Sequence, residues 1–211
     1  MSSFFKSLCE KGKKMFDIVL DTELPIGIKL DDEHQAQENA KCKEIAEMTI
    51  AAAETSGYFK PDILPVIAEK IRALSVPGYA YSGPFDKEDV LSLEEKKALG
   101  LNTRRKYSRE LINGLTEKGI AAENPNDLLK NLFMQSCGKV SRKYELARLK
   151  ELGLKYVQII DCEDARDCKA VKRCKKRWLI DEVPELPLSG CDAEYCRCQY
   201  VADEKEMLGD L

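Results

Sequence analysis

Apolar residues recur with a helical period over most of the chain. Residues 31–55 run from an acidic start, DDEHQAQE, into Ala- and Ile-rich sequence. This pattern predicts a helix with its negative charges at the favourable N-terminal end and Gly57 as its stop. A second helix is expected to begin near Pro61, since proline suits the first turn of a helix. Its apolar spacing predicts one buried face made of Ile63, Val66, Ile67, Ile71 and Leu74.

Capping residues and glycines predict four further helices. Ser92 followed by Glu95 is a capping-box pattern, which predicts a short helix ending at the next glycine. A longer helix, capped by Asn102 or Thr103, is expected to reach Lys118 with Gly119 as its stop. Two more are predicted, the first from Asn124 and Pro125 to about Cys137, the second from Ser141 to Leu152 before Gly153.

Only one segment has the composition of a strand. Residues 154–160, LKYVQII, are rich in β-branched and aromatic side chains. The fold expected is therefore mainly α, a helical body with a small C-terminal α+β cysteine-rich module. Residues 76–84, rich in Gly, Pro, Ser and Tyr, are expected to form a linker. We expect three regions: a helical region at 1–80, a helical region with a helix-turn-helix-like hairpin at 81–153, and the cysteine-rich, metal-stabilised module at 154–211.

Charge and hydropathy narrow the classes of function. The chain has 34 Lys and Arg against 37 Asp and Glu, so any nucleic-acid surface must be local. Its longest apolar run, around Met48–Ala53, is far shorter than the roughly 20 residues of a membrane span. Residues 1–20 mix Phe and Lys and lack the apolar core of an export signal. They predict an amphipathic helix, packed on the body or lying on a membrane or partner, in a cytoplasmic protein.

Cysteine is the residue type with the most distinctive distribution. Of nine cysteines, Cys9, Cys42 and Cys137 stand alone in helical contexts and are expected to be buried as small apolar residues. The other six lie within residues 162–198. Clustered cysteines in a reducing compartment indicate metal binding rather than disulfides.

A structural zinc site requires four ligands in a tetrahedron. In a helix, Cys168 and Cys174 would point about 120° apart, so they should not bind the same ion. His34 lies in an acidic helix start far from the cluster, which favours an all-sulfur site. We therefore expect zinc to be held by Cys168, Cys191, Cys196 and Cys198. Cys162 and Cys174 are the reserve ligands.

Two other interpretations of the cysteines remain open. Cys196 and Cys198 could form a redox pair, with Arg197 helping to lower one thiol pKa. Alternatively, the reduced thiols only pack.

The module also resembles a known family. Its order of strand, acidic Cys-containing turn and Leu-Pro segment before a final Cys-Arg-Cys resembles the C-terminal part of phage head-morphogenesis (minor capsid) proteins. The residues that carry this resemblance are Leu154, Asp164, Cys168, Trp178, Pro184, Leu186, Pro187, Cys196, Arg197 and Cys198. The module lacks the family's His-Pro-Asn before the final pair and a C-x-x-C at Cys168, and is also similar to cysteine-rich tails of bacterial proteins. The resemblance implies a bacterial or phage origin and a metal-stabilised α+β unit, with no catalytic residue.

Two basic segments suggest nucleic-acid binding as an alternative. Residues 93–118 have helix-turn-helix proportions, although generic helical hairpins share them. In residues 169–177, six of nine are Lys or Arg, which could contact phosphates or simply form a solvated helix face. The candidate residues are Arg104, Arg105, Lys106, Arg109, Lys172, Arg173 and Lys176.

No P-loop, dinucleotide fingerprint, nucleophile elbow or metalloprotease helix is present in the sequence, which makes an enzyme the less favoured class. We expect a non-enzymatic binding or assembly protein with structural zinc, acting through a protein partner or through self-assembly.

Overall fold

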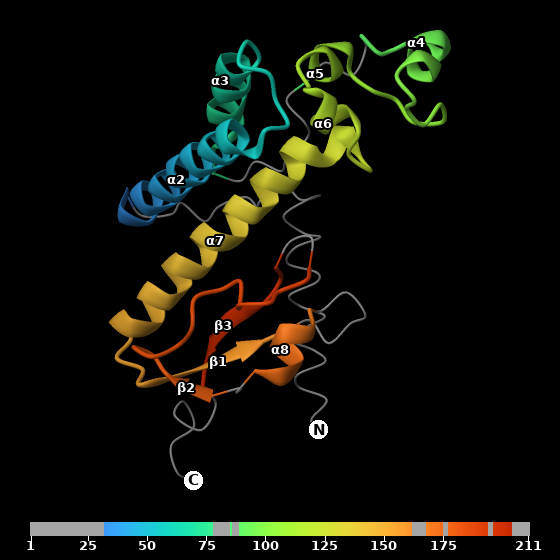
Figure 1. Ribbon diagram of the computed structural model, residues 1–211. Helices are drawn as coiled ribbons and strands as arrows, with labels where there is room; N and C mark the ends of the chain where they lie inside the picture. Colours follow the sequence, from blue (N-terminus) through green and yellow to red (C-terminus); the bar gives the residue numbers. More distant parts are fainter. Residues whose placement is uncertain are drawn as a thin grey trace.

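The computed structural model describes residues 32–77, 85, 89–161, 168–174, 177–193 and 196–203 (Figure 1). Its fold is mainly α with a small α+β region, as predicted, and this region contains a three-stranded antiparallel sheet. The expected N-terminal amphipathic helix, most of the expected linker at 76–84, and Cys9, Cys162 and Lys176 lie outside the described residues. None of the helices that the structure describes has the length and apolar character needed to cross a membrane.

Two of the predicted helices form a hairpin at the N-terminal end of the described chain. Helix α2 (Asp32–Ser56) ends at Gly57, whose φ of +70° is left-handed and easily adopted by glycine. Helix α3 (Leu64–Leu74) packs against α2 and buries Ile67 and Ile71. It begins later than expected, with Pro65 rather than Pro61 in its first turn.

The capping box is confirmed at α4 (Leu93–Ala98). The Ser92 side chain accepts the Glu95 N–H, and the Glu95 carboxylate accepts the Ser92 N–H. The predicted long helix up to Lys118 is wrong. The segment instead holds two short helices, α5 (Arg109–Asn113) and α6 (Glu117–Ile120), and Gly119 lies inside α6.

Tertiary hydrogen bonds explain why this long helix does not form. Ser108 forms an isolated β-bridge with Val90, and Leu115 forms one with Phe59. Next to the second bridge, Lys60 N–H donates to the Gly114 carbonyl at 2.8 Å and Thr116 N–H donates to the Tyr58 carbonyl at 2.9 Å. Backbone groups that a continuous helix would pair internally are thus paired with distant segments.

The structure has one long helix, α7, where the sequence predicted two. The two helices predicted on either side of residues 138–140 are one helix, α7 (Leu128–Glu151), preceded by the short 3-10 helix η1 (Pro125–Asp127). An interior glycine such as Gly138 costs a helix about 1 kcal/mol, an amount that packing along the helix can offset. Helix α7 packs against α2 and against the sheet, and it runs between the two in Figure 1.

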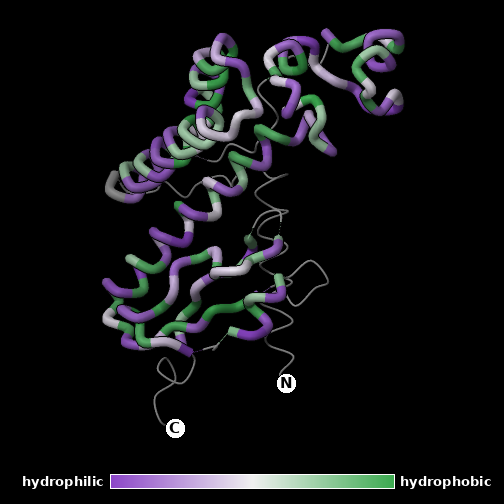
Figure 2. Tube along the Cα trace, viewed as in Figure 1, coloured by the Kyte–Doolittle hydropathy of each residue, from purple (hydrophilic) through white to green (hydrophobic). Residues whose placement is uncertain are grey.

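The sheet forms the centre of the C-terminal module. The predicted strand is confirmed as β1 (Tyr156–Ile160), the middle strand in the order β2-β1-β3. The flanking strands β2 (Arg177–Leu179) and β3 (Gln199–Ala202) were not predicted, because three or four residues carry too little periodicity. Both pair antiparallel with β1, much of which is green, the hydrophobic end of the scale, in Figure 2.

The buried apolar side chains form two hydrophobic clusters. The first, here called the helical cluster, joins α2, α3, the segment from 85 to 115 and the start of α7 at Leu129 and Phe133. The second, the module cluster, joins Leu149 near the end of α7 to the sheet and the cysteine-bearing loops. The two regions predicted as 1–80 and 81–153 both contribute to the helical cluster.

Candidate metal centre

Four cysteine thiols meet in the C-terminal module. Cys168 is the N-cap of α8 (Lys169–Arg173), Cys191 follows a turn, and Cys196 and Cys198 lie just before β3. The Cys191 thiol is hydrogen-bonded with those of Cys168 and Cys196, and the Cys198 thiol likewise with those of Cys196 and Cys168. These contacts close a ring, here called the thiol ring, in which each sulfur has two sulfur neighbours. The four cysteines favoured from the sequence are thus brought together, while zinc binding by them stays a prediction.

Asp192 fixes Cys191 beside Cys168. The Cys168 side chain makes no capping hydrogen bond at the start of α8. The Asp192 carboxylate caps α8 instead. It accepts the Lys169 N–H at 3.0 Å and lies 3.4 Å from the Lys169 ammonium. The backbone hydrogen bond from Lys169 is the main reason that the pKa of Asp192 is lowered.

Two of the sulfurs accept backbone hydrogen bonds. Gly190, with φ +79°, allows the turn in which Cys191 N–H donates to the Leu188 carbonyl at 3.0 Å. After this turn, Ala193 N–H donates to the Cys191 sulfur, and Cys198 N–H donates to the Cys196 sulfur. Such N–H donors stabilise negative charge on sulfur, which is the state in which a thiol binds metal.

Tyr200 holds the loop that precedes the turn. This tyrosine is buried in β3, and its hydroxyl donates to the Pro184 carbonyl at 2.8 Å and accepts the Leu186 N–H at 3.0 Å. Leu186 is itself buried in the module cluster. The loop that leads to Cys191 is therefore anchored to the strand that follows Cys198.

Negative charge in the thiol ring concentrates on Cys196. The hydrogen bond from the Cys198 thiol is the main cause that lowers the pKa of Cys196 to about 6, aided by the Cys198 N–H and the charge of Arg142. The same hydrogen bond, together with burial, raises the pKa of Cys198. Burial raises the pKa of Cys191 to about 11. A metal bound here would have to displace the remaining thiol protons.

Arg142 is the functional candidate that sequence reasoning missed. It lies on α7, is 7 % exposed, and donates from Nη1 to the Cys196 carbonyl at 3.1 Å. The sequence suggested Arg197 as a cation that helps to lower a thiol pKa, and in the structure the charge of Arg142 helps to lower the pKa of Cys196. A side chain at Gly138 would come 3.0 Å from Arg142 Nη1, so this glycine leaves room for the guanidinium. The Gly-x-x-x-Arg spacing was the available signal, but many helices contain it.

A cavity of about 270 Å³ lies between α7 and the cysteine-bearing loops. Two cysteines of the thiol ring and two cationic residues line it, and its described lining has no acidic residue. The lining consists of Gln135, Lys139, Arg142, Pro187, Cys191, Ala193 and Cys196.

The remaining described cysteines lie elsewhere. Cys174 is at the opposite end of α8 from Cys168. Cys137 packs against the helical cluster, as expected for a small apolar residue, and burial raises its pKa to about 12. Cys42 on α2 is partly buried, and burial raises its thiol pKa as well.

Among the described residues, no three His, Cys, Asp or Glu side chains already stand in a metal-holding geometry. In a tetrahedral zinc site with bonds of about 2.3 Å, the sulfurs are roughly 4 Å apart. The thiols of the ring are joined by hydrogen bonds and would have to lose their remaining protons to bind an ion.

The basic candidates around α5 do not form a recognition helix. Arg104, Arg105 and Lys106 precede α5 outside any helix. Arg109 lies in α5, where it pairs with Asp89 at 3.0 Å and with Glu95. These two carboxylates compete with any phosphate for Arg109 and tie it to the segment around α4.

The other basic candidates lie in the module. Lys172 and Arg173 are exposed on α8. Figure 1 shows α8 beside the sheet, whereas α5 lies near the N-terminal end of α7. The two basic groups therefore occupy different elements in different parts of the molecule.

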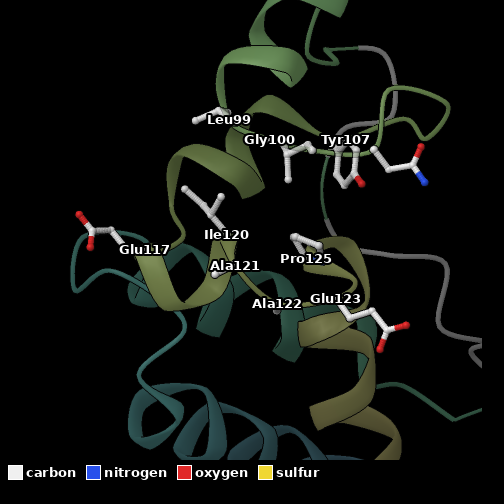
Figure 3. A pocket seen from close by; sticks show the side chains of 11 residues that line it. Leu99, Gly100, Tyr107, Glu117, Ile120, Ala121, Ala122, Glu123 and Pro125 are labelled. Carbon is white, nitrogen blue, oxygen red and sulfur yellow. The ribbon is translucent and has the colours of Figure 1, made fainter.

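A second cavity of about 360 Å³ lies near the start of α7 (Figure 3). Gly100 and Tyr107 are on one side, Ile120 and Pro125 are on the other, and the Glu117 and Glu123 side chains point outward. The described lining contains no cysteine, histidine or basic residue. It therefore offers an apolar side chain a place to pack, but no ligand set for a metal.

No protein-family model, no curated protein and no solved structure matches the chain.

Proposed function

We propose that the thiol ring binds one zinc ion as a structural tetrathiolate centre, and that this centre fixes the C-terminal module against α7. The observation that carries the proposal is the closed ring of contacts among Cys168, Cys191, Cys196 and Cys198. These cysteines come from three separate segments of the chain. Four thiolates are the ligands of a closed structural zinc site, and sulfur ligands favour zinc over magnesium or calcium.

The size of the module cluster supports a structural role for the metal. Among the described residues it has nine buried members, and two of these are the cysteines Cys168 and Cys198. Small domains with little apolar core commonly need a metal or a disulfide. In a reducing compartment such as the cytoplasm, zinc binding contributes its free energy directly to folding.

Metal content and one matched pair of variants test this proposal. We expect the full chain, purified under reducing conditions, to hold one zinc ion, and its cobalt form to show the charge-transfer absorption of cobalt–thiolate bonds. Cys198→Ser should lose the metal and the absorption. Cys174→Ser, which changes a cysteine of the same module outside the thiol ring, should keep both. Wild-type protein that binds no zinc after reconstitution would contradict the proposal.

We further propose that the stabilised module serves binding or assembly, with a protein partner or a second copy of the chain. Its resemblance to the C-terminal part of phage head-morphogenesis proteins supports this role. Two exposed leucines, Leu152 at the end of α7 and Leu179 on the edge strand β2, offer an apolar contact. Light scattering of the zinc form over a range of concentrations tests self-assembly, and Leu152→Ser with Leu179→Ser should weaken it.

A thiol redox function is the second candidate, because the pKa of Cys196 is lowered to about 6 beside the Cys198 thiol. Attack by the Cys196 thiolate on a partner disulfide would release one partner thiolate and form a mixed disulfide. Cys198 would then displace the second thiolate and leave a Cys196–Cys198 disulfide. Wild-type protein that cycles between dithiol and disulfide, and does so without metal, would favour this function over zinc.

A further inference from the structure

Arg142 is a buried cation that lacks the usual partner. Its only described hydrogen bond runs from Nη1 to the neutral carbonyl of Cys196, and Nε is enclosed without a hydrogen-bond partner. No ion pair joins Arg142 to an Asp or Glu within the described residues. A buried cation that no anion compensates is strongly destabilising. The position of Arg142 therefore indicates that negative charge gathers close to it.

The groups around Arg142 indicate which of them could supply this negative charge. The guanidinium interacts with the Cys196 thiol and the Tyr200 hydroxyl, and its cavity is also lined by Cys191 and Lys139. Of these groups, the cysteines are the ones that metal binding makes anionic. Four thiolates around one divalent zinc ion leave an excess of negative charge, which a buried cation at this position would offset.

We propose that Arg142 is the counter-charge of the zinc–thiolate centre, a positioning residue through which metal binding docks the module on α7. This inference rests on the proposed zinc site. Arg142 holds the backbone of Cys196 through Nη1, and its Nε is buried without a hydrogen-bond partner. The guanidinium charge is permanent, so the same side chain weakens the metal-free form and strengthens the loaded form.

Three variants separate this role from simple packing. Arg142→Met removes the charge and keeps much of the side-chain length, whereas Arg142→Lys keeps the charge. Lys139→Met removes the other cation of the cavity, which is exposed rather than buried. Zinc affinity is measured by competition with a chromophoric chelator, and the thermal midpoint of the metal-free chain is measured alongside.

Arg142→Met should bind zinc about 10- to 100-fold more weakly, the usual effect of losing a group that supports metal ligands. Its metal-free thermal midpoint should stay the same or rise, because an uncompensated buried charge is gone. Arg142→Lys should recover most of the affinity. Lys139→Met should change it less than threefold, because solvent screens an exposed charge.

The decisive result is that Arg142→Met weakens zinc binding while the thermal midpoint of the metal-free chain stays the same or rises. An Arg142→Met variant with wild-type zinc affinity would overturn the inference, and so would one that loses stability equally with and without metal. If Arg142→Met does not fold, Arg142→Gln carries the same comparison. Wild-type protein that binds no zinc would instead remove the zinc site itself, so the failure of the two proposals can be told apart.

Discussion

Two buried charged residues show different solutions to the same problem. Asp203 is 1 % exposed and lies 2.9 Å from Arg177 Nε, and its carboxylate accepts a hydrogen bond from Gln158 Nε2 at 3.1 Å. Arg177 also stacks over the Tyr156 ring, 3.9 Å from the ring centroid. Asp203 is thus compensated by side chains of the neighbouring strands, whereas Arg142 faces thiols.

Replacing Asp203 tests how much this carboxylate stabilises the sheet. Asp203→Asn keeps the size but removes the charge that pairs with Arg177, and we expect a loss of about 1–3 kcal/mol, reduced because Arg177 is partly exposed. Urea unfolding followed by Trp178 fluorescence reports on β2 directly, since the chain has one tryptophan.

The matched control is Asp181→Asn. That carboxylate is 82 % exposed and pairs with Lys150 at 2.8 Å, so its loss should cost less than about 0.5 kcal/mol. Equal effects of the two substitutions would show that burial of Asp203 adds nothing to the stability of the sheet.

For single residues, the sequence predicted those that belong to a local pattern. It missed those whose importance comes from burial in the folded chain. Ser92 and Glu95 were recognised because a capping box lies within four consecutive residues. The four cysteines of the thiol ring followed from counting cysteines and from helix geometry at Cys168 and Cys174. Arg142 and Asp203 were missed, because nothing local distinguishes a buried arginine or aspartate from the exposed ones that surround it.

Among the elements, helix α4 carries both a local and a distant contact through one side chain. The Glu95 carboxylate caps the helix at Ser92 and also accepts hydrogen bonds from Arg109 of α5, one of them at 3.1 Å. The hydrogen bond with Arg109 is the largest cause that lowers the pKa of Glu95 to about 2. Glu95 therefore links two short helices that the sequence predicted as a helix-turn-helix hairpin.

The lowered pKa of Glu95 predicts a pH dependence of stability. Because the folded pKa is depressed, the contribution of Glu95 is fully present above its unfolded pKa near 4.5 and is lost as the pH falls toward 2. Glu95→Gln should therefore lower the thermal midpoint at neutral pH, and its difference from wild type should shrink between pH 4.5 and 2. Circular dichroism melts across this range measure the difference.

Glu94→Gln, in the same helical turn, is the control for general acid effects and should follow the wild-type curve. A constant difference between Glu95→Gln and wild type down to pH 2 would contradict the link between Glu95 and Arg109.

Helix α6 depends on a close backbone approach at Gly119. A Cβ atom there would collide with the Tyr58 carbonyl oxygen, which is held by its hydrogen bond from Thr116 N–H. Gly119→Ala should therefore cost about 1–3 kcal/mol in urea unfolding, because backbone atoms cannot move aside as a side chain can.

Gly138→Ala is the matched substitution on α7. Its Cβ would lie 3.0 Å from Arg142 Nη1, at the far end of a long side chain rather than at the backbone, and alanine improves helix propensity by about 1 kcal/mol. Its effect on metal-free stability should be near zero or favourable. A comparable loss at both glycines would mean that the Tyr58 contact is not what makes Gly119 necessary.

For the whole molecule, hydrophobic periodicity was enough to predict the mainly α fold and the small α+β module. It could not predict which helices share a cluster, because such contacts join segments far apart in the chain. It also divided α7 at Gly138, since the sequence does not reveal the packing on both sides of that helix. The result is two hydrophobic clusters that meet along α7, from Phe133 in one to Leu149 in the other.

Combined with the proposed zinc site, this arrangement predicts that metal removal loosens one end of the molecule. Of the residues that the structure describes, the buried members of the module cluster include Cys168 and Cys198, whereas those of the helical cluster include no cysteine. Chelation of zinc, or Cys198→Ser, should therefore increase amide hydrogen exchange in β1, β2 and β3 and leave α2 and α3 close to wild type. Hydrogen exchange read by mass spectrometry resolves these elements, with Cys174→Ser as the control that keeps the metal. Faster exchange in α2 to the same degree would mean that the clusters unfold together. Unchanged exchange in the strands would mean that the thiols pack without a metal, because only a bound ion makes the order of the sheet depend on a chelator.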